Sequence, residues 1–204
     1  MPATLLRARD GALLRLDIER WHGEATVAEM GVLAGVTGPV IDIGCGPGRF
    51  VVGLARRGVV ALGIDPVPGA IHAARRRGAC VLQRSVFDPL PGERRWQSAL
   101  LMDGNVGIGG DPVRLLSRCR ALVAPGGTIV VELHPPGTGE RHHRARLERG
   151  GEAGPWFEWA EVGVDAIGSI AAAAGMRADR IDRLAAEGRW FARLITEERL
   201  SVVA

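Results

Sequence analysis

The sequence predicts an α/β fold in which a mainly parallel, doubly wound sheet carries helices on both faces. From residue 39 onward, short β-branched runs alternate with helical runs, and a glycine-rich loop joins the first of these strands to its helix. Two strands separated by a tight turn close the chain. Strands that alternate with helices pair in parallel, and such sheets bind ligands at the carboxyl ends of their strands.

Hydrophobic periodicity and turn residues give the element ranges. Strands are expected at 40–43, 59–64, 80–83, 96–102 and 128–133, and helices at 49–57, 69–77 and 111–123. The last helix opens with Asp111 and Pro112, a favourable N-cap and first-turn pair. A helix at 162–174 and strands at 177–184 and 189–195 follow. The final two strands read as a hairpin, so this end of the sheet should be antiparallel.

Two regions depart from the alternation. Residues 1–38 are expected to form a helical cap segment, because Thr26 and Glu29 have capping-box spacing ahead of apolar residues. Residues 39–204 should form the main domain. Within it, residues 135–160 are rich in glycine, proline, arginine and histidine, which predicts a long loop or lid.

Composition favours a cytoplasmic protein with a hydrophobic core. Hydrophobic residues make up 47% of the 204 positions, but no apolar run approaches the ~20 residues that span a bilayer. The three cysteines are far apart, which suits a reducing compartment. The net charge is +3, and all 26 basic residues are arginine. That bias fits codon usage better than a selected basic surface, so nucleic acid is not the expected partner.

The segment Asp42–Gly48 contains Gly44-x-Gly46-x-Gly48 between a strand and a helix, as in nucleotide-type sites. The dinucleotide fingerprint needs a further glycine where this chain has Arg49, so the loop suits another ligand. Asp65 ends the next strand, where a carboxylate can accept hydrogen bonds from ribose hydroxyls. The alternatives are a tight turn for the loop and a helix cap for Asp65.

With these residues the chain resembles the class I S-adenosylmethionine-dependent methyltransferases. The matching motifs are Val40–Gly48, Gly63-Ile64-Asp65 and Leu122–Thr128, and the resemblance is close over residues 38–134. Within the family, the chain is similar to small bacterial type 11/12-like proteins. The resemblance implies a three-layer fold around a seven-stranded sheet with one antiparallel strand. It also implies S-adenosylmethionine as cofactor.

The resemblance also implies which residues hold the cofactor. The expected set is Asp42, Gly44, Cys45, Gly46, Asp65, Pro66, Ser85, Val86 and Asp103. Ser85 and Val86 stand where the family usually has an acid and a small residue beside the adenine. Asp88, three residues after Ser85, is an alternative contact or only a turn residue.

Candidate acceptor residues follow the fourth and fifth strands. Asn105 lies in a glycine-rich segment, and His134 lies where a histidine would be well placed as a general base. Both are the expected catalytic residues, with a flexible loop and a structural histidine as alternatives. The expected substrate-binding residues are Trp21, Trp156, Trp159 and Arg141. For these, core packing and a solvated loop are the alternatives. No histidine spacing of a known metal site is present, so no metal is expected.

The sequence therefore predicts in-line methyl transfer from S-adenosylmethionine to a small-molecule acceptor. An RNA or protein methyltransferase is the first alternative. A nicotinamide-linked oxidoreductase and a non-catalytic cofactor-binding protein are the others.

Overall fold

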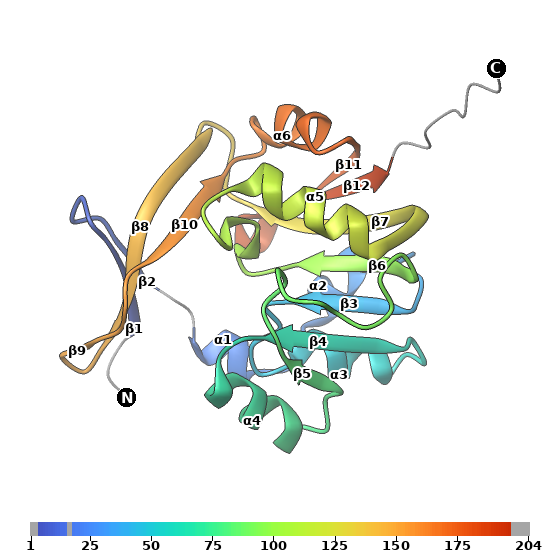
Figure 1. Cartoon of the computed structure of the whole chain (residues 1–204), viewed down its shortest axis with the longest axis horizontal. Coiled ribbons are helices and arrows are strands. Elements are labelled where there is room, and N and C mark those ends of the chain that lie inside the picture. Colours follow the sequence, from blue (N-terminus) through green and yellow to red (C-terminus); the bar gives the residue numbers. More distant parts are fainter. Residues whose placement is uncertain (1–3, 16–17, 197–204) are drawn as a thin grey trace.

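The computed structural model describes residues 4–15 and 18–196, which form two β-sheets and their covering helices (Figure 1). The larger sheet has seven strands in the order β11-β12-β7-β6-β3-β4-β5. These are β3 Val40–Ile43, β4 Ala61–Asp65, β5 Val81–Gln83, β6 Trp96–Leu101, β7 Val123–Leu133, β11 Met176–Leu184 and β12 Arg189–Thr196. Strand β12 pairs antiparallel with both β7 and β11, and the other neighbours pair in parallel. The predicted Rossmann-like sheet with one antiparallel strand is confirmed.

Helices cover both faces of this sheet and give the predicted three layers. They are α1 Ile18–His22, α2 Val27–Val32, α3 Arg49–Ala55, α4 Pro68–Arg76, α5 Pro112–Leu122 and α6 Ile167–Ala173, with short 3-10 turns η1 Asn105–Gly107 and η2 Ala185–Glu187. Alternate residues of each strand face opposite layers. In β3, Val40 packs with the apolar side chains of α2, α3 and α4, whereas Ile41 and Ile43 pack with those of α5 and α6.

The N-terminal segment is only partly helical, which corrects the prediction for residues 1–38. Strands β1 Thr4–Ala8 and β2 Leu13–Arg15 form an antiparallel hairpin before α1 and α2. The capping box of α2 is confirmed, since Thr26 and Glu29 each accept a hydrogen bond from the other's backbone N–H. Strand β1 forms because it pairs with a segment about 140 residues away, a partner that local periodicity does not reveal.

The predicted long loop at 135–160 is also wrong for most of its length. This segment holds β8 Glu140–Arg149, β9 Glu152–Ala153 and most of β10 Phe157–Val162. Together with the N-terminal hairpin they form a second, antiparallel sheet in the order β10-β8-β1-β2, with β9 paired to β8. Because β10 extends to Val162, helix α6 begins five residues later than predicted, at Ile167. We call this second sheet the small sheet.

The small sheet stands across the carboxyl ends of β3, β4 and β6 (Figure 1). Its register places Leu6 opposite Leu147, Ala145 opposite Phe157, and His143 opposite Trp159. These side chains share one face of the small sheet, and that face lines the cavities described below. In the described part of the chain, no helix has the length and apolar character needed to cross a membrane.

Candidate functional site

The glycine loop between β3 and α3 is held from two sides. The Asn105 side-chain amide donates hydrogen bonds of 2.9 Å to the carbonyl oxygens of Ile43 and Gly44. Gly44 has φ +69°, and a Cβ added there would lie 2.6 Å from Asn105 Nδ2. Only glycine suits that position, because it tolerates both the positive φ and the close approach. Asn105, one of the two predicted catalytic residues, therefore holds the loop.

Asp65, at the end of β4, holds the other side of the loop. Its Oδ2 accepts a hydrogen bond of 3.0 Å from the Gly46 N–H, and its Oδ1 accepts one of 2.8 Å from the Val67 N–H. Burial raises the pKa of Asp65, and the two backbone hydrogen bonds oppose that shift. Each carboxylate oxygen has a second lone pair, so Asp65 can still accept hydrogen bonds from a ligand.

Asp42, in β3, is a buried carboxylate with an unsatisfied oxygen. Its Oδ2 has no hydrogen-bond partner among the described residues. Burial, and secondarily the nearby negative charge of Asp103, raises the pKa of Asp42 to about 7. Unsatisfied buried oxygens are rare and costly, so a bound donor is expected there. Nearby, a Cβ on Gly46 would meet no atom within 4 Å, which leaves the loop backbone open to a ligand.

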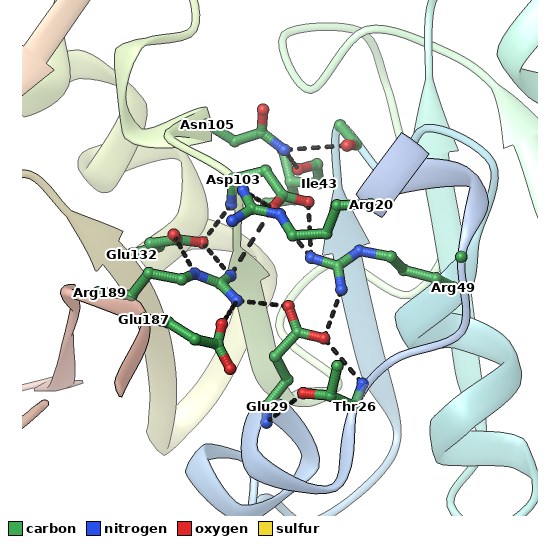
Figure 2. Close-up of polar contacts among 12 residues, drawn as sticks. Arg20, Thr26, Glu29, Ile43, Arg49, Asp103, Asn105, Glu132, Glu187 and Arg189 are labelled. Atoms are coloured by element: carbon green, nitrogen blue, oxygen red, sulfur yellow. Dashed lines mark hydrogen bonds and ion pairs between the residues drawn. The ribbon is translucent and has the colours of Figure 1, made fainter. Parts of the chain in front are cut away.

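Five charged side chains form a set of ion pairs that we call the ionic cluster: Glu29, Arg49, Asp103, Glu132 and Arg189 (Figure 2). The charges of Arg49 and Asp103 act on the nearby Asp42. Arg49 contacts Glu29 at 2.5 Å and Asp103 at 2.9 Å. Arg189 donates to Glu132 at 2.8 Å and to Glu29 at 2.5 Å. Arg20, on α1, also reaches Asp103 at 3.0 Å. Asp103 thus lies among arginine side chains.

Glu29 lies at the centre of the ionic cluster and is fully buried. Burial alone would raise its pKa, but hydrogen bonds from Arg49, the Thr26 backbone and Arg189 lower it to about 2. In the sequence, Glu29 was expected only to cap a helix, and Arg49 was noted only because it stands where the dinucleotide fingerprint has a glycine. The chain separation of 160 residues between Glu29 and Arg189 explains why their pairing was not foreseen.

A cavity of about 350 Å³ opens beside the glycine loop. Its lining includes the predicted residues Gly44, Cys45, Gly46, Asp65, Pro66, Ser85, Val86, Asp103, Asn105, Trp21 and Trp159. Asp42 does not line this first cavity. Several other lining residues were not predicted, namely Leu6, Arg49, Arg84, Ile108, Leu147 and Phe157. Three of these six belong to the small sheet, whose strands were predicted as cap and loop.

Two of the predicted cofactor residues, Ser85 and Cys45, have surroundings that limit the roles they can take. Asp88 accepts the Ser85 backbone N–H at 2.9 Å, and Ser85 Oγ accepts the Phe87 N–H at 3.3 Å, so Asp88 orders the turn after β5. Burial raises the pKa of the Cys45 thiol far above its ordinary value. That thiol therefore stays protonated at neutral pH and does not act as a nucleophile.

A second cavity of about 350 Å³ lies along the same face of the small sheet. It is lined by His134 and Arg141, two of the predicted acceptor-site residues, and by His143 and Glu161, which were not predicted. Leu6 and Trp159 line both cavities. His134 therefore lies at the second cavity and is not part of the first.

Trp156 is separated from the other predicted substrate residues. It precedes β10 and is partly exposed, with the Arg146 guanidinium 4.7 Å from its ring centroid. It lines neither of the two cavities. Among the residues that the structure describes, no group of three or more His, Cys, Asp or Glu side chains is arranged to hold a metal ion.

The sequence profile of a family described as a methyltransferase domain matches residues 24–162. An uncharacterised protein of Mycobacterium tuberculosis is 33% identical over 147 residues, which is 68% of this chain and 48% of that protein. A ubiquinone biosynthesis O-methyltransferase of Methylococcus capsulatus is 33% identical over 98 residues, 44% of this chain and 40% of its own length. The chain thus spans about half the length of the curated relatives it matches.

Solved structures agree at the level of the fold. A methyltransferase of Bacteroides fragilis, crystallised with S-adenosylhomocysteine, has a TM-score of 0.77 at 19% identity and covers 96% of this chain and 88% of its own. A sugar N-methyltransferase of Streptoalloteichus has a TM-score of 0.61 at 18% identity, over 87% and 88% of the two chains. The family profile covers more than half of this chain, including the glycine loop, Asp65 and Glu161. The chain belongs to the methyltransferase-domain family, of the class I, S-adenosylmethionine-dependent type that its motifs resemble.

Proposed function

We propose that the first cavity binds S-adenosylmethionine and that the protein transfers its methyl group to a small-molecule acceptor. The observation that carries the proposal is the unpartnered Oδ2 of buried Asp42 beside an open glycine loop. A carboxylate in that state suits a cationic or N–H group of a ligand. When bound, the cofactor supplies an activated sulfonium methyl group.

The cofactor's parts suit different residues of the site. Asp65 would accept hydrogen bonds from the ribose hydroxyls, and Asp42, which does not line the cavity, would position the loop or hold the amino group through water. Arg49 lines the cavity and carries the positive charge that suits the cofactor's carboxylate. Ser85 and Val86 would lie beside the adenine. Gly44, Cys45, Gly46 and Pro66 would shape the wall, with Asp103 holding the arginines in place.

The shape of the site supports a small acceptor. The small sheet lies across the carboxyl ends of the parallel strands, and its Leu147, Phe157 and Trp159 line the first cavity together with Trp21 of α1. A partly enclosed space suits a small molecule better than a folded RNA or protein. The Trp21 indole N–H is buried without a hydrogen-bond partner among the described residues, so it can donate to a ligand.

For the transfer itself, the protein must orient the acceptor and in some cases remove a proton. Asn105 serves as a positioning residue, because its amide N–H groups already hold the loop. His134 stays the proposed proton acceptor, at the second cavity. Replacing His134 by Ala should spare cofactor binding and slow turnover once a substrate is found. Unchanged turnover would remove it from this role.

Calorimetric titration with S-adenosylmethionine, S-adenosylhomocysteine and NAD tests the cofactor proposal. We expect both sulfur nucleosides to bind and NAD to fail. Asp65→Ala should weaken binding by about a hundredfold, because a buried carboxylate that accepts two ligand hydrogen bonds is lost. The control Asp179→Ala removes an exposed acid on β11 and should leave binding unchanged. Binding of NAD alone would overturn the proposal.

A further inference from the structure

Buried carboxylates in the described part of this protein fall into two groups. Five acidic side chains are at most 8% exposed: Glu29, Asp42, Asp65, Glu132 and Glu161. Glu29 and Glu132 each form ion pairs with buried arginines. Within the described residues, no arginine ion pair reaches any of the other three. Asp42 and Asp65 belong to the proposed cofactor site, which leaves Glu161 without an assigned role.

Glu161 projects from β10 into the second cavity. Its Oε2 lies 3.2 Å from His143 Nε2, a hydrogen bond, and its Oε1 lies 3.9 Å from His134 Nε2, beyond hydrogen-bond length. A buried carboxylate is costly unless it is paired with a charge or fully hydrogen-bonded. One imidazole hydrogen bond and one more distant imidazole leave Glu161 Oε1 open to a further donor.

The remaining lining of the second cavity adds acidic and apolar character. Asp10 Oδ2 lies 4.0 Å from His143 Nδ1, so this imidazole sits between two carboxylates. Arg141 is the cation in this lining, and it is exposed to solvent, where its charge is screened. The rest of the wall is Leu6, Ala8, Ala12, Thr138, Ala145 and Trp159.

The position of this cavity relates it to the cofactor site. Leu6 and Trp159 line both cavities, and the same face of the small sheet continues from one to the other. An acceptor held in the second cavity would therefore lie next to the proposed cofactor, with Trp159 at the boundary. An aromatic ring at that boundary also attracts cations.

From these observations we propose that the second cavity is the acceptor subsite and that it takes a small amine, bound in its protonated form by Glu161 with His143 and Asp10. Before transfer the ammonium would give one proton to His134, which lines the same cavity. The freed nitrogen lone pair would then form the N–C bond as the C–S bond of the sulfonium breaks, with S-adenosylhomocysteine as the leaving group. This inference rests on the proposed function, because it names the acceptor class of the same site. The ammonium group of the amine would supply a positive charge opposite the Glu161 carboxylate.

Benzylamine and benzyl alcohol form a matched pair of probes, since benzylamine carries an ammonium group where benzyl alcohol carries a hydroxyl. The protein is titrated with each in the presence of saturating S-adenosylhomocysteine, and the imidazole signals of ¹⁵N-labelled protein are followed by NMR. We expect benzylamine to shift His134 and His143 and to leave His72, exposed on α4, unchanged. Its affinity should exceed that of benzyl alcohol at least about tenfold, as for a charge-assisted hydrogen bond to a buried acid. Equal affinities, or shifts confined to His72, would overturn the proposal.

Substitutions on one strand supply the variant and its control. Glu161→Gln should weaken benzylamine binding at least about tenfold while leaving benzyl alcohol unchanged. Glu158→Gln, also on β10 but paired with Arg144 at the surface, should change neither affinity. If Glu161→Gln does not fold, Asp10→Asn takes its place with a smaller loss of about two- to threefold, because Asp10 is largely exposed. Unchanged benzylamine affinity in the folded variant would overturn the proposal.

The two proposals fail in different ways. Calorimetry on the same sample reports S-adenosylhomocysteine binding, which depends on the first cavity alone. If S-adenosylhomocysteine binds and benzylamine does not, the amine subsite is wrong and the cofactor proposal stands. If S-adenosylhomocysteine does not bind, the proposed function itself fails.

Discussion

The ionic cluster and the wall of the second cavity both contain buried carboxylates, but the charges of these carboxylates are compensated to different degrees. In the ionic cluster, Glu29 accepts hydrogen bonds from Arg49 and Arg189. At the second cavity, Glu161 of similar burial has two imidazoles as its charged or hydrogen-bonding side-chain partners within the described residues. The first arrangement compensates its charge inside the protein, whereas the second leaves a charge for a ligand to compensate.

This difference separates the acids that pair with arginines from the acids that we propose to bind ligands. The ionic cluster joins α2, α3, β7, β12 and the segment after β6, so it connects distant parts of the chain beside the first cavity (Figure 2). Asp65 and Glu161 line cavities, where a ligand can approach, and Asp42 is buried close to the first of them. Substitutions in the cluster should therefore affect stability first, and substitutions at the cavities should affect binding first.

The largest effect is expected from Arg189→Met. This change leaves buried Glu29 and Glu132 short of a partner, which should lower the free energy of unfolding by about 3–5 kcal/mol. Urea denaturation measures it. The control Arg180→Met removes a surface arginine that pairs with Asp182 on β11, and its effect should stay below about 1 kcal/mol. Equal effects of the two substitutions would remove the distinction between the cluster and a surface pair.

Acidification should remove the contribution of Glu29 to the free energy of unfolding. Its pKa in the folded protein is about 2, below the ordinary 4.5, so its stabilising contribution is present above pH 4.5 and is lost as the pH falls toward 2. The loss should amount to about 3 kcal/mol, followed as the unfolding free energy against pH. Glu29→Gln should be less stable at neutral pH and lose less on acidification. A variant with the acid profile of the original protein would show that Glu29 is not responsible.

Asp42 should give cofactor binding a pH dependence near neutral pH, because its pKa is raised where that of Glu29 is lowered. Its raised pKa, about 7, means that the free protein must lose a proton before the carboxylate can face a cationic group. Affinity for S-adenosylhomocysteine should therefore rise about fivefold from pH 6 to pH 7. In Asp42→Asn this rise should vanish, as calorimetry can check.

The same raised pKa also affects the free protein. A carboxyl group that binds its proton more tightly when folded stabilises the protein below pH 3.8, and that contribution is lost as the pH rises through 7. A flat affinity profile in the original protein, together with a stability profile of this form, would place Asp42 outside the binding site.

The smallest effect is expected from Trp156→Ala. Its ring lies against Arg146 and lines neither cavity, so affinities for S-adenosylhomocysteine and benzylamine should change less than about twofold. The matched variant Trp159→Ala removes the residue that borders both cavities and should weaken both affinities. A comparable loss in Trp156→Ala would show that the tryptophan at the surface belongs to the site.

The sequence alone determined the parallel sheet, the glycine loop and Asp65. Each depends on a short segment: β-branched runs, glycines at fixed spacing, and an acid at the end of a strand. The terminal hairpin was predicted for the same reason, since β11 and β12 are adjacent in the chain. Local signals of this kind suffice where the partner strand is near or the ligand contacts the backbone of one loop.

The tertiary structure decided the small sheet, the second cavity and the ionic cluster. Strand β8, Glu140–Arg149, is strongly charged, and its sequence predicted a loop. In the structure it is a strand because it pairs with β1 and β10. Strand propensity depends on cross-strand partners, and here one partner lies about 140 residues away. For the same reason, neither the pairing of Glu29 with Arg189 nor the exposure of Glu161 to a cavity follows from any local pattern, because both depend on segments that only folding brings together.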